Sequence, residues 1–161
     1  MILCIIYLRQ NQLILKPKMK ILFLSLRNCC RSQIAEAILK HIEPNLEIYS
    51  AGIDPAPEIN PVVFEIMKEA GIPVNEKKPS AFTEIAGLEF DYLITVGDST
   101  IEEFKIPPLK YKQKIHLGFH NPFKNQKDIH KIKESCREIR DEIMVELDYF
   151  SHHYIQPTKA R

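Results

Sequence analysis

The residues best suited to chemistry lie in one short polar turn between Ser25 and Ser32. Arg31 offers a planar fork of donors that matches the oxygens of a tetrahedral anion such as phosphate, arsenate or sulfate. Asn28 tolerates the left-handed backbone that turns N–H groups inward, and Ser32 supplies a hydroxyl donor or a helix cap. These residue types predict an oxyanion site, although Arg31 and Ser32 would also suit the start of an ordinary surface helix.

The elements on either side of this turn would aim it. Ile21–Leu24 is a continuous apolar run typical of a buried strand, whereas apolar residues recur at helical spacing from Ile34 to Leu39. A strand that enters a helix through a tight loop directs the loop N–H groups and the positive end of the helix at one point. The stretch Ile21–Lys40 therefore predicts an anion-binding loop.

The same turn resembles the loop C-x-x-N-x-x-R-S of the low-molecular-weight protein tyrosine phosphatases and of the thioredoxin-coupled arsenate reductases that share their fold. Asn28, Arg31 and Ser32 match that pattern. The resemblance covers about residues 19–150 and is closer to the arsenate reductase branch. Other stretches that carry it are Ser50–Gly52, Asn60–Pro61, Met67–Ile72, Phe90–Val96 and His116–Phe119.

The resemblance implies a fold, a ligand and a set of site residues. The fold would be α/β, a flavodoxin-like three-layer open sheet of four parallel strands with helices on both faces, and the ligand would lie beyond the carboxyl ends of the strands. The ligand would be phosphate, arsenate or a phosphorylated molecule; no cofactor is implied, and a protein partner stays open. The residues implied to bind the oxyanion are Ser25, Leu26, Arg27, Asn28, Cys29, Cys30, Arg31 and Ser32, and the catalytic positions would be Ser25, Arg31 and Asn121.

Three positions depart from the family pattern, and each departure removes a group that the family's chemistry uses. The nucleophilic cysteine is replaced by Ser25, whose hydroxyl the positive field of the loop does not ionise at neutral pH. The Asp-Pro general acid reads Asn121-Pro122, and asparagine has no proton to give a leaving oxygen. The strand that ends in a redox cysteine in arsenate reductases continues as Val96-Gly97-Asp98. We expect binding to persist and turnover by the family mechanism to be impaired.

Two functions from different classes remain open. The first is a binding module that keeps the oxyanion loop without the nucleophile, the acid and the redox cysteine. The second is an active arsenate reductase or phosphomonoester phosphatase that uses Cys30 or an unrecognised base, or a chain in which Ser25 was introduced by engineering. Cys29 and Cys30 adjoin each other in the loop, and we interpret Cys30 as a small packing residue. The independent changes at Asn121 and near Gly97 favour the first function.

Composition limits the remaining possibilities. With 161 residues, 45% of them hydrophobic, the chain fits one globular domain. The 22 basic and 21 acidic residues give a net charge of +1, so nothing favours nucleic acid or a membrane surface as a partner. Four cysteines without a spaced framework, and an apolar opening too short to span a bilayer, predict a cytoplasmic protein.

Patterning along the chain predicts the remaining organisation. Residues 1–18 form an N-terminal extension, in which Ile2–Tyr7 could add a strand or contact a partner; residues 19–150 form the phosphatase-like domain, and residues 151–161 a frayed tail. Lys105, Lys110, Lys112 and Lys114 suggest a solvated loop or a basic rim. The histidines His116, His120 and His130 lack the partners of a metal site.

Expected elements besides the first strand and helix are strands at Leu46–Ser50, Asp91–Val96 and Ile115–Leu117, a helix from Asn60-Pro61, a short helix at Ile85–Leu88 and a long helix at Ile129–Phe150.

Overall fold

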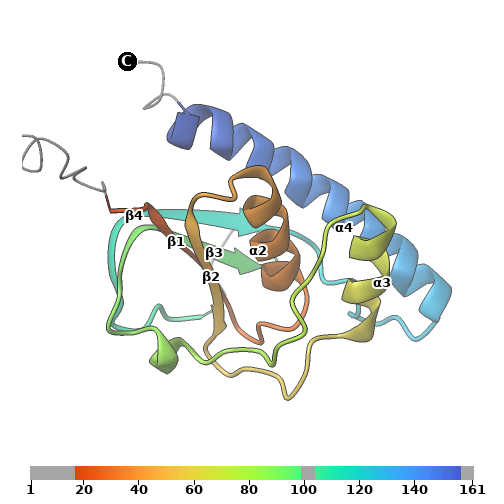
Figure 1. Cartoon of the computed structure of the whole chain (residues 1–161). Helices are drawn as coiled ribbons and strands as arrows, with labels where there is room; N and C mark the ends of the chain where they lie inside the picture. Colours follow the sequence, from red (N-terminus) through yellow and green to blue (C-terminus); the bar gives the residue numbers. More distant parts are fainter. Residues whose placement is uncertain (1–16, 99–103, 157–161) are drawn as a thin grey trace, which may run out of the picture.

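The computed structural model describes residues 17–98 and 104–156, and these residues form a sheet of four parallel strands (Figure 1). The strands follow the order β2-β1-β3-β4. Their bounds are Lys20–Ser25 for β1, Glu47–Gly52 for β2, Glu89–Gly97 for β3 and Lys110–Gly118 for β4. The central strands β1 and β3 are buried along most of their length, which explains their continuous apolar sequence. The predicted flavodoxin-like sheet is confirmed.

Three α-helices accompany the sheet in the described residues: α2 (Arg31–Ile42), α3 (Pro61–Glu69) and α4 (Ile129–Phe150). Local sequence sets the start of two of them. The side chain of Asn60 accepts a hydrogen bond from the Val62 N–H ahead of α3, and Asp128 accepts one from the His130 N–H ahead of α4. The helix predicted from Asn60-Pro61 and the helix predicted over Ile129–Phe150 are therefore confirmed.

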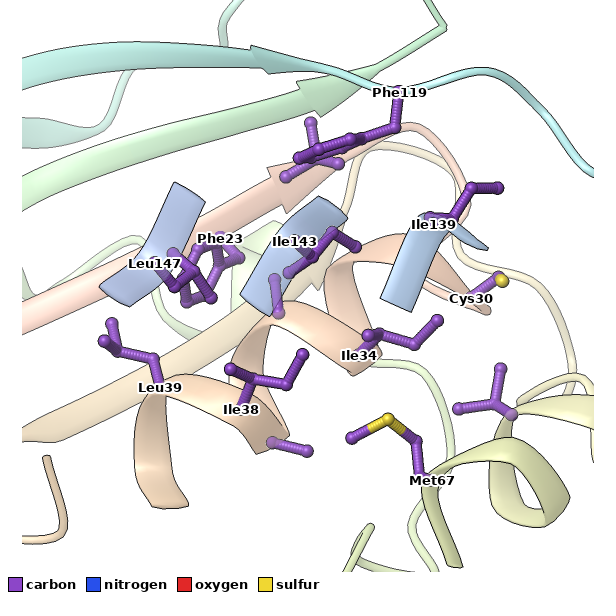
Figure 2. Close-up of a cluster of buried hydrophobic side chains, with 14 of the residues drawn as sticks. Phe23, Cys30, Ile34, Ile38, Leu39, Met67, Phe119, Ile139, Ile143 and Leu147 are labelled. Carbon is purple, nitrogen blue, oxygen red and sulfur yellow. The ribbon is translucent and has the colours of Figure 1, made fainter. Parts of the chain in front are cut away.

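The helices α2, α3 and α4 share one hydrophobic cluster with one face of the sheet (Figure 2). Phe23 of β1 is fully buried in it, together with Met67 of α3. The six residues that the sequence places on one stripe of α4 are all buried there: Ile132, Cys136, Ile139, Ile143, Leu147 and Phe150. Burial of apolar surface from three helices makes this face the main core of the domain.

The opposite face of the sheet is covered differently. Its buried residues Leu22, Leu24, Ala51, Phe90 and Leu93 pack against partly buried side chains from connecting segments, including Phe82, Ile85, Leu88, Phe104, Ile106 and Leu109. The helical structure described on this side is the 3₁₀ turn η1 (Phe82–Glu84). On this side of the sheet the described residues meet the prediction of helices on both faces through η1, and connecting segments supply the rest of the cover.

Two predicted boundaries are wrong for identifiable reasons. Strand β4 begins at Lys110, ahead of the predicted Ile115–Leu117, and its first five residues are exposed. Strand β4 is at the edge of the sheet, so its lysines are exposed and give the polar pattern of a loop. The backbone of this stretch nevertheless pairs with β3. The short helix expected at Ile85–Leu88 lies earlier in the chain, as η1.

The residues directly after 150, where the sequence predicts a tail, are helical. The helical path continues as the π-helix η2 (Ser151–Ile155), and Ser151 and Ile155 are buried. The Ser151 hydroxyl donates to the buried Glu43 carboxylate at 2.6 Å. This contact fixes the start of the expected tail against the end of α2, so residues 151–155 are not frayed.

Several expectations concern residues that lie wholly or partly outside the described ranges. The proposed N-terminal extension lies almost wholly outside the described residues. Among the residues that are described, no helix is long and apolar enough to cross a bilayer. The same residues hold no cluster of three or more potential metal ligands, and His116 and His120 instead bond to Thr95 and Ser135.

Candidate oxyanion site

The loop after β1 lies at the carboxyl ends of the two central strands. β1 connects through α2 to β2 on one side, whereas its other neighbour, β3, comes later in the chain. Such a reversal of strand order opens a crevice in which ligands of open α/β sheets bind. The loop that the sequence singled out therefore occupies the expected ligand position of the fold.

Asn28 is the centre of the loop. Its φ is 51°, the left-handed conformation that the sequence predicts, and its side chain is buried. Its amide nitrogen Nδ2 donates to Ser32 Oγ at 3.0 Å. Its Oδ1 accepts from Gln33 Nε2 at 2.9 Å and from the Ser80 N–H at 3.0 Å. One side chain thus connects the loop, the first turn of α2 and the segment ahead of β3.

The loop carbonyl groups point outward, toward the connection between β2 and α3. The oxygens of Ser25, Leu26, Arg27 and Cys29 accept hydrogen bonds of 2.9–3.0 Å from the backbone N–H groups of Ile53, Asp54, Ala56 and Asn60. The described residues contain no cis peptide bond, and in a trans peptide the C=O and the following N–H point in opposite directions. The N–H groups of the loop are therefore directed away from this connection and toward the cavity.

The first turn of α2 completes the set of donors. The N-cap residue is Cys30, and no side chain caps the helix, so its first N–H groups stay available to a ligand. Ser32 is not a helix cap: its hydroxyl bonds to the Ser25 hydroxyl at 2.9 Å. Ser25 Oγ also accepts from the Asn28 N–H at 3.0 Å. The hydroxyl at the family's nucleophile position is thus held by two partners within the loop.

Arg31 extends from the loop across to the segments that follow β3 and β4. Its Nη1 donates to the Phe119 carbonyl at 2.7 Å and lies 2.5 Å from Asp98 Oδ1. Its side chain is only 18% exposed. The guanidinium therefore lies at the edge of the cavity in a fixed position, as an oxyanion contact requires.

The cavity between these groups measures about 210 Å³, enough for a tetrahedral oxyanion. It is lined by Ser25, Leu26, Arg27, Asn28, Cys29, Cys30, Arg31 and Ser32 from the loop side, and by Val96, Gly97, Asp98, Phe104, Asn121 and Phe123 from the facing side. Every predicted site residue is therefore brought together around one space.

Asn121 stands on the facing side and stabilises a turn. Its Oδ1 accepts a hydrogen bond from the Phe123 N–H at 3.0 Å. Since its carboxamide carries no ionisable proton, it can orient a ligand by donating from Nδ2, but it cannot protonate a leaving oxygen in the way a carboxylic acid does.

The loop thiols lie in different surroundings. Cys30 is buried in the main core (Figure 2). Its contact with the Cys136 thiol of α4, and then burial, raise the pKa of Cys30 well above the ordinary thiol value. Cys29 is half-buried; burial raises its pKa, although Arg27 and Arg31 oppose this effect. Neither thiol is therefore poised as a thiolate.

Sequence reasoning missed five residues on the facing side of the cavity. Val96, Gly97, Asp98, Phe104 and Phe123 line it but were not predicted as site residues. A polar residue directly after a central parallel strand was the available signal for Asp98, since the carboxyl ends of such strands border the ligand crevice. The two phenylalanines come from irregular segments that gave no signal.

Gly52, at the end of β2, lies in close contact with the backbone of the loop. A Cβ at this position would lie 3.0 Å from the Leu26 carbonyl oxygen and 3.1 Å from Asn28 Cβ. The loop thus packs directly on a residue without a side chain, which explains the glycine in the Ser50–Gly52 stretch.

Residues 20–151 match the family model described as low molecular weight phosphotyrosine protein phosphatase. An arsenate reductase of Halalkalibacterium halodurans is 32% identical over 127 residues, which cover 78% of this chain and 90% of that protein.

Solved structures agree on the fold. An arsenate reductase from Archaeoglobus fulgidus superposes with a TM-score of 0.62 at 23% identity, covering 80% of this chain and 98% of the other. An arsenate reductase in the phosphate binding state gives a TM-score of 0.66 at 19% identity, covering 82% and 95%. With its matching sequence model, its relatives and this shared architecture, the chain belongs to the low molecular weight phosphotyrosine protein phosphatase family.

Proposed function

We propose that this protein binds a tetrahedral oxyanion, either phosphate, arsenate or the phosphoryl group of a larger ligand, in the loop formed by residues 25–32. The observation that carries the proposal is the outward direction of the loop carbonyls, whose oxygens bond to the connection between β2 and α3. This direction leaves the loop N–H groups, the uncapped start of α2 and Arg31 facing one cavity. Family membership supports the same ligand class.

We further propose that the protein is catalytically impaired by comparison with enzymes that attack through a thiolate. Ser25 occupies the nucleophile position, and its hydroxyl is engaged by Ser32 and by the Asn28 N–H. Asn121 replaces the general acid. The loss of the nucleophile affects bond formation, and the loss of the general acid affects proton transfer. Binding of an oxyanion by Arg31 and the loop amides requires neither group.

An active phosphatase or arsenate reductase that uses Cys30 is the competing function. The burial of Cys30 and its contact with Cys136 weigh against this competing function, because the Cys30 thiol would have to ionise in an apolar core. Within the described residues the cysteines Cys29, Cys30 and Cys136 are free, which supports our proposal that the protein works in the reducing cytoplasm. A phosphorylated protein is a candidate partner, since Phe104 and Phe123 add apolar surface to the lining of the cavity.

Thermal unfolding in the presence of phosphate or arsenate tests the binding function. Either ion should raise the melting temperature of the unmodified chain in a saturable manner, since a ligand that binds the native state stabilises it. Arg31→Ala should weaken binding by about tenfold or more, equivalent to about 1.4 kcal/mol.

The matched control is Arg137→Ala. Arg137 also pairs with a carboxylate, that of Glu69, but on α4 and away from the loop, so its variant should respond as the unmodified chain does. Equal stabilisation of the Arg31→Ala variant and the unmodified chain would refute the proposal. Hydrolysis of an aryl phosphate that disappears with Cys30→Ser would instead establish the competing enzyme.

A further inference from the structure

Arg31 already has an anionic neighbour in the empty site. Asp98 follows the last residue of β3 and places its Oδ1 2.5 Å from Arg31 Nη1. The two side chains are 23% and 18% exposed, and both line the cavity of the loop. The guanidinium that would contact the oxyanion is therefore neutralised from within the protein.

The geometry of this pair is unusual for a stable salt bridge. Asp98 Oδ1 is excluded from solvent, and within the described residues it receives no hydrogen bond of good geometry despite the short distance to Arg31. The same Nη1 donates to the Phe119 carbonyl instead. A buried carboxylate oxygen without an aligned donor leaves the pair less stable than a bidentate arginine–carboxylate pair.

A bound oxyanion would bring a second negative charge into the same space. The backbone beside Asp98 is fixed, because Gly97 pairs with Gly118 of β4 and its carbonyl accepts from the Phe119 N–H at 2.9 Å. The carboxylate must then either turn away from Arg31 or stay beside the ligand as a like charge. Both alternatives cost binding free energy, and the second costs more for a doubly charged ligand than for a singly charged one.

We propose that Asp98 occupies Arg31 in the empty site as an internal substitute for the ligand, and thereby sets both the affinity of the loop and its preference for anion charge. This inference rests on the oxyanion-binding function proposed above and adds the residue that determines its selectivity. Asp98 lowers the affinity for all oxyanions and discriminates most strongly against dianions.

Two tetrahedral ions that keep a fixed charge test this role. Sulfate is a dianion and perchlorate a monoanion across the working pH range, so binding of each can be measured by calorimetry at constant ionic strength. Asp98→Asn should bind sulfate about tenfold more tightly than the unmodified chain, because a like charge close to the ligand is removed. The gain for perchlorate should be smaller, so the ratio of the sulfate affinity to the perchlorate affinity rises.

A second variant and a matched control keep the result interpretable. Asp98→Ala should show the same gain for sulfate, which separates loss of the charge from a new hydrogen bond made by asparagine. Asp141→Asn removes an exposed carboxylate that pairs with Arg140 on α4 and does not line the cavity, and its sulfate affinity should change less than about twofold.

The outcomes separate this inference from the binding function. If Arg31→Ala abolishes sulfate binding while Asp98→Asn and Asp98→Ala leave it unchanged or weaken it, the loop binds oxyanions but the role of Asp98 is refuted. If neither the unmodified chain nor the Asp98 variants bind sulfate, both proposals fail. Sulfate binding that appears only in the Asp98 variants and requires Arg31 would support the inference.

Discussion

The two walls of the cavity are constructed differently. The loop wall, Ser25–Ser32, is connected internally through Asn28 and externally through four outward carbonyls. The facing wall, Val96–Asp98 with Phe104, Asn121 and Phe123, joins the loop side through Arg31, which contacts Asp98 and also donates to the Phe119 carbonyl. The residues that differ from the catalytic pattern beyond Ser25 lie on the facing wall. The loop wall therefore carries most of the groups that we propose to bind the oxyanion, whereas the facing wall carries Asn121, which we propose limits turnover, and Asp98, which we propose adjusts the affinity.

Restoring the catalytic groups should produce the largest effect. Ser25→Cys places a thiol among the loop amides and beside Arg31, so hydrolysis of an aryl phosphate should appear. Adding Asn121→Asp should raise the rate further, by about 10²–10⁴-fold, since a general acid is restored. Steady-state rates of the single and double variants measure both steps. A double variant that binds phosphate but has no activity would show that the facing wall has changed in more than its chemical groups.

Removing the centre of the loop should be the most damaging change to stability. Asn28→Ala loses the side-chain bonds to Ser32, Gln33 and Ser80 and forces alanine into a positive φ, which should cost about 2–4 kcal/mol in urea unfolding. Asn125 provides the control, because it is exposed and also has a positive φ of 57°. Asn125→Ala should cost about 1 kcal/mol. Similar losses in the two variants would mean that the hydrogen bonds of Asn28 contribute little.

The glycine beneath the loop should show a smaller effect. Gly52→Ala brings a Cβ within 3.0–3.2 Å of loop atoms, so it should destabilise the protein by about 1–3 kcal/mol and weaken phosphate binding. Gly87→Ala meets nothing within 4 Å and should be neutral or stabilise by up to about 1 kcal/mol. Chemical unfolding and phosphate titration measure both. Unchanged phosphate affinity in the Gly52 variant would show that the loop can shift without losing its ligand.

The buried thiol should give the smallest effect, visible only at high pH. Because the native state raises the pKa of Cys30 above the ordinary value of 9.0, the unfolded chain loses that proton first. The stability gained from burying the neutral thiol is complete below pH 9.0 and declines as pH rises above it. Cys30→Ala should reduce this decline between neutral pH and pH 10 in urea unfolding. An identical pH dependence in the two proteins would contradict it.

The sequence predicts the loop wall better than the facing wall for a physical reason. The left-handed residue at Asn28 and the helix start at Arg31 depend on neighbours in sequence, so their pattern was readable. Asp98 reaches the cavity because β3 lies beside β1, and although its place after a central strand is a signal, its contact with Arg31 depends on that long-range pairing. Phe104 lies in an irregular segment that gives no signal.

The same distinction explains the errors in the fold. The lysines at the start of β4 are exposed on an edge strand, so their polarity concealed a parallel pairing with β3. The packing of three helices on one face follows from how the chain crosses the sheet. The contact between Cys30 and Cys136, more than a hundred residues apart, likewise appears only after α2 and α4 have packed.

The segment that holds the outward carbonyls has one further consequence for how this protein can vary. Asp54 and Ala56 donate their N–H groups to the loop, and the residues that alternate with them, Pro55 and Pro57, have no N–H to give. The spacing of donors and prolines matters here, whereas the side chains of Asp54 and Ala56 take no part in these hydrogen bonds. Substitutions at Asp54 and Ala56 should therefore be tolerated, while insertion of a single residue between them would set a proline opposite a carbonyl and open the binding loop.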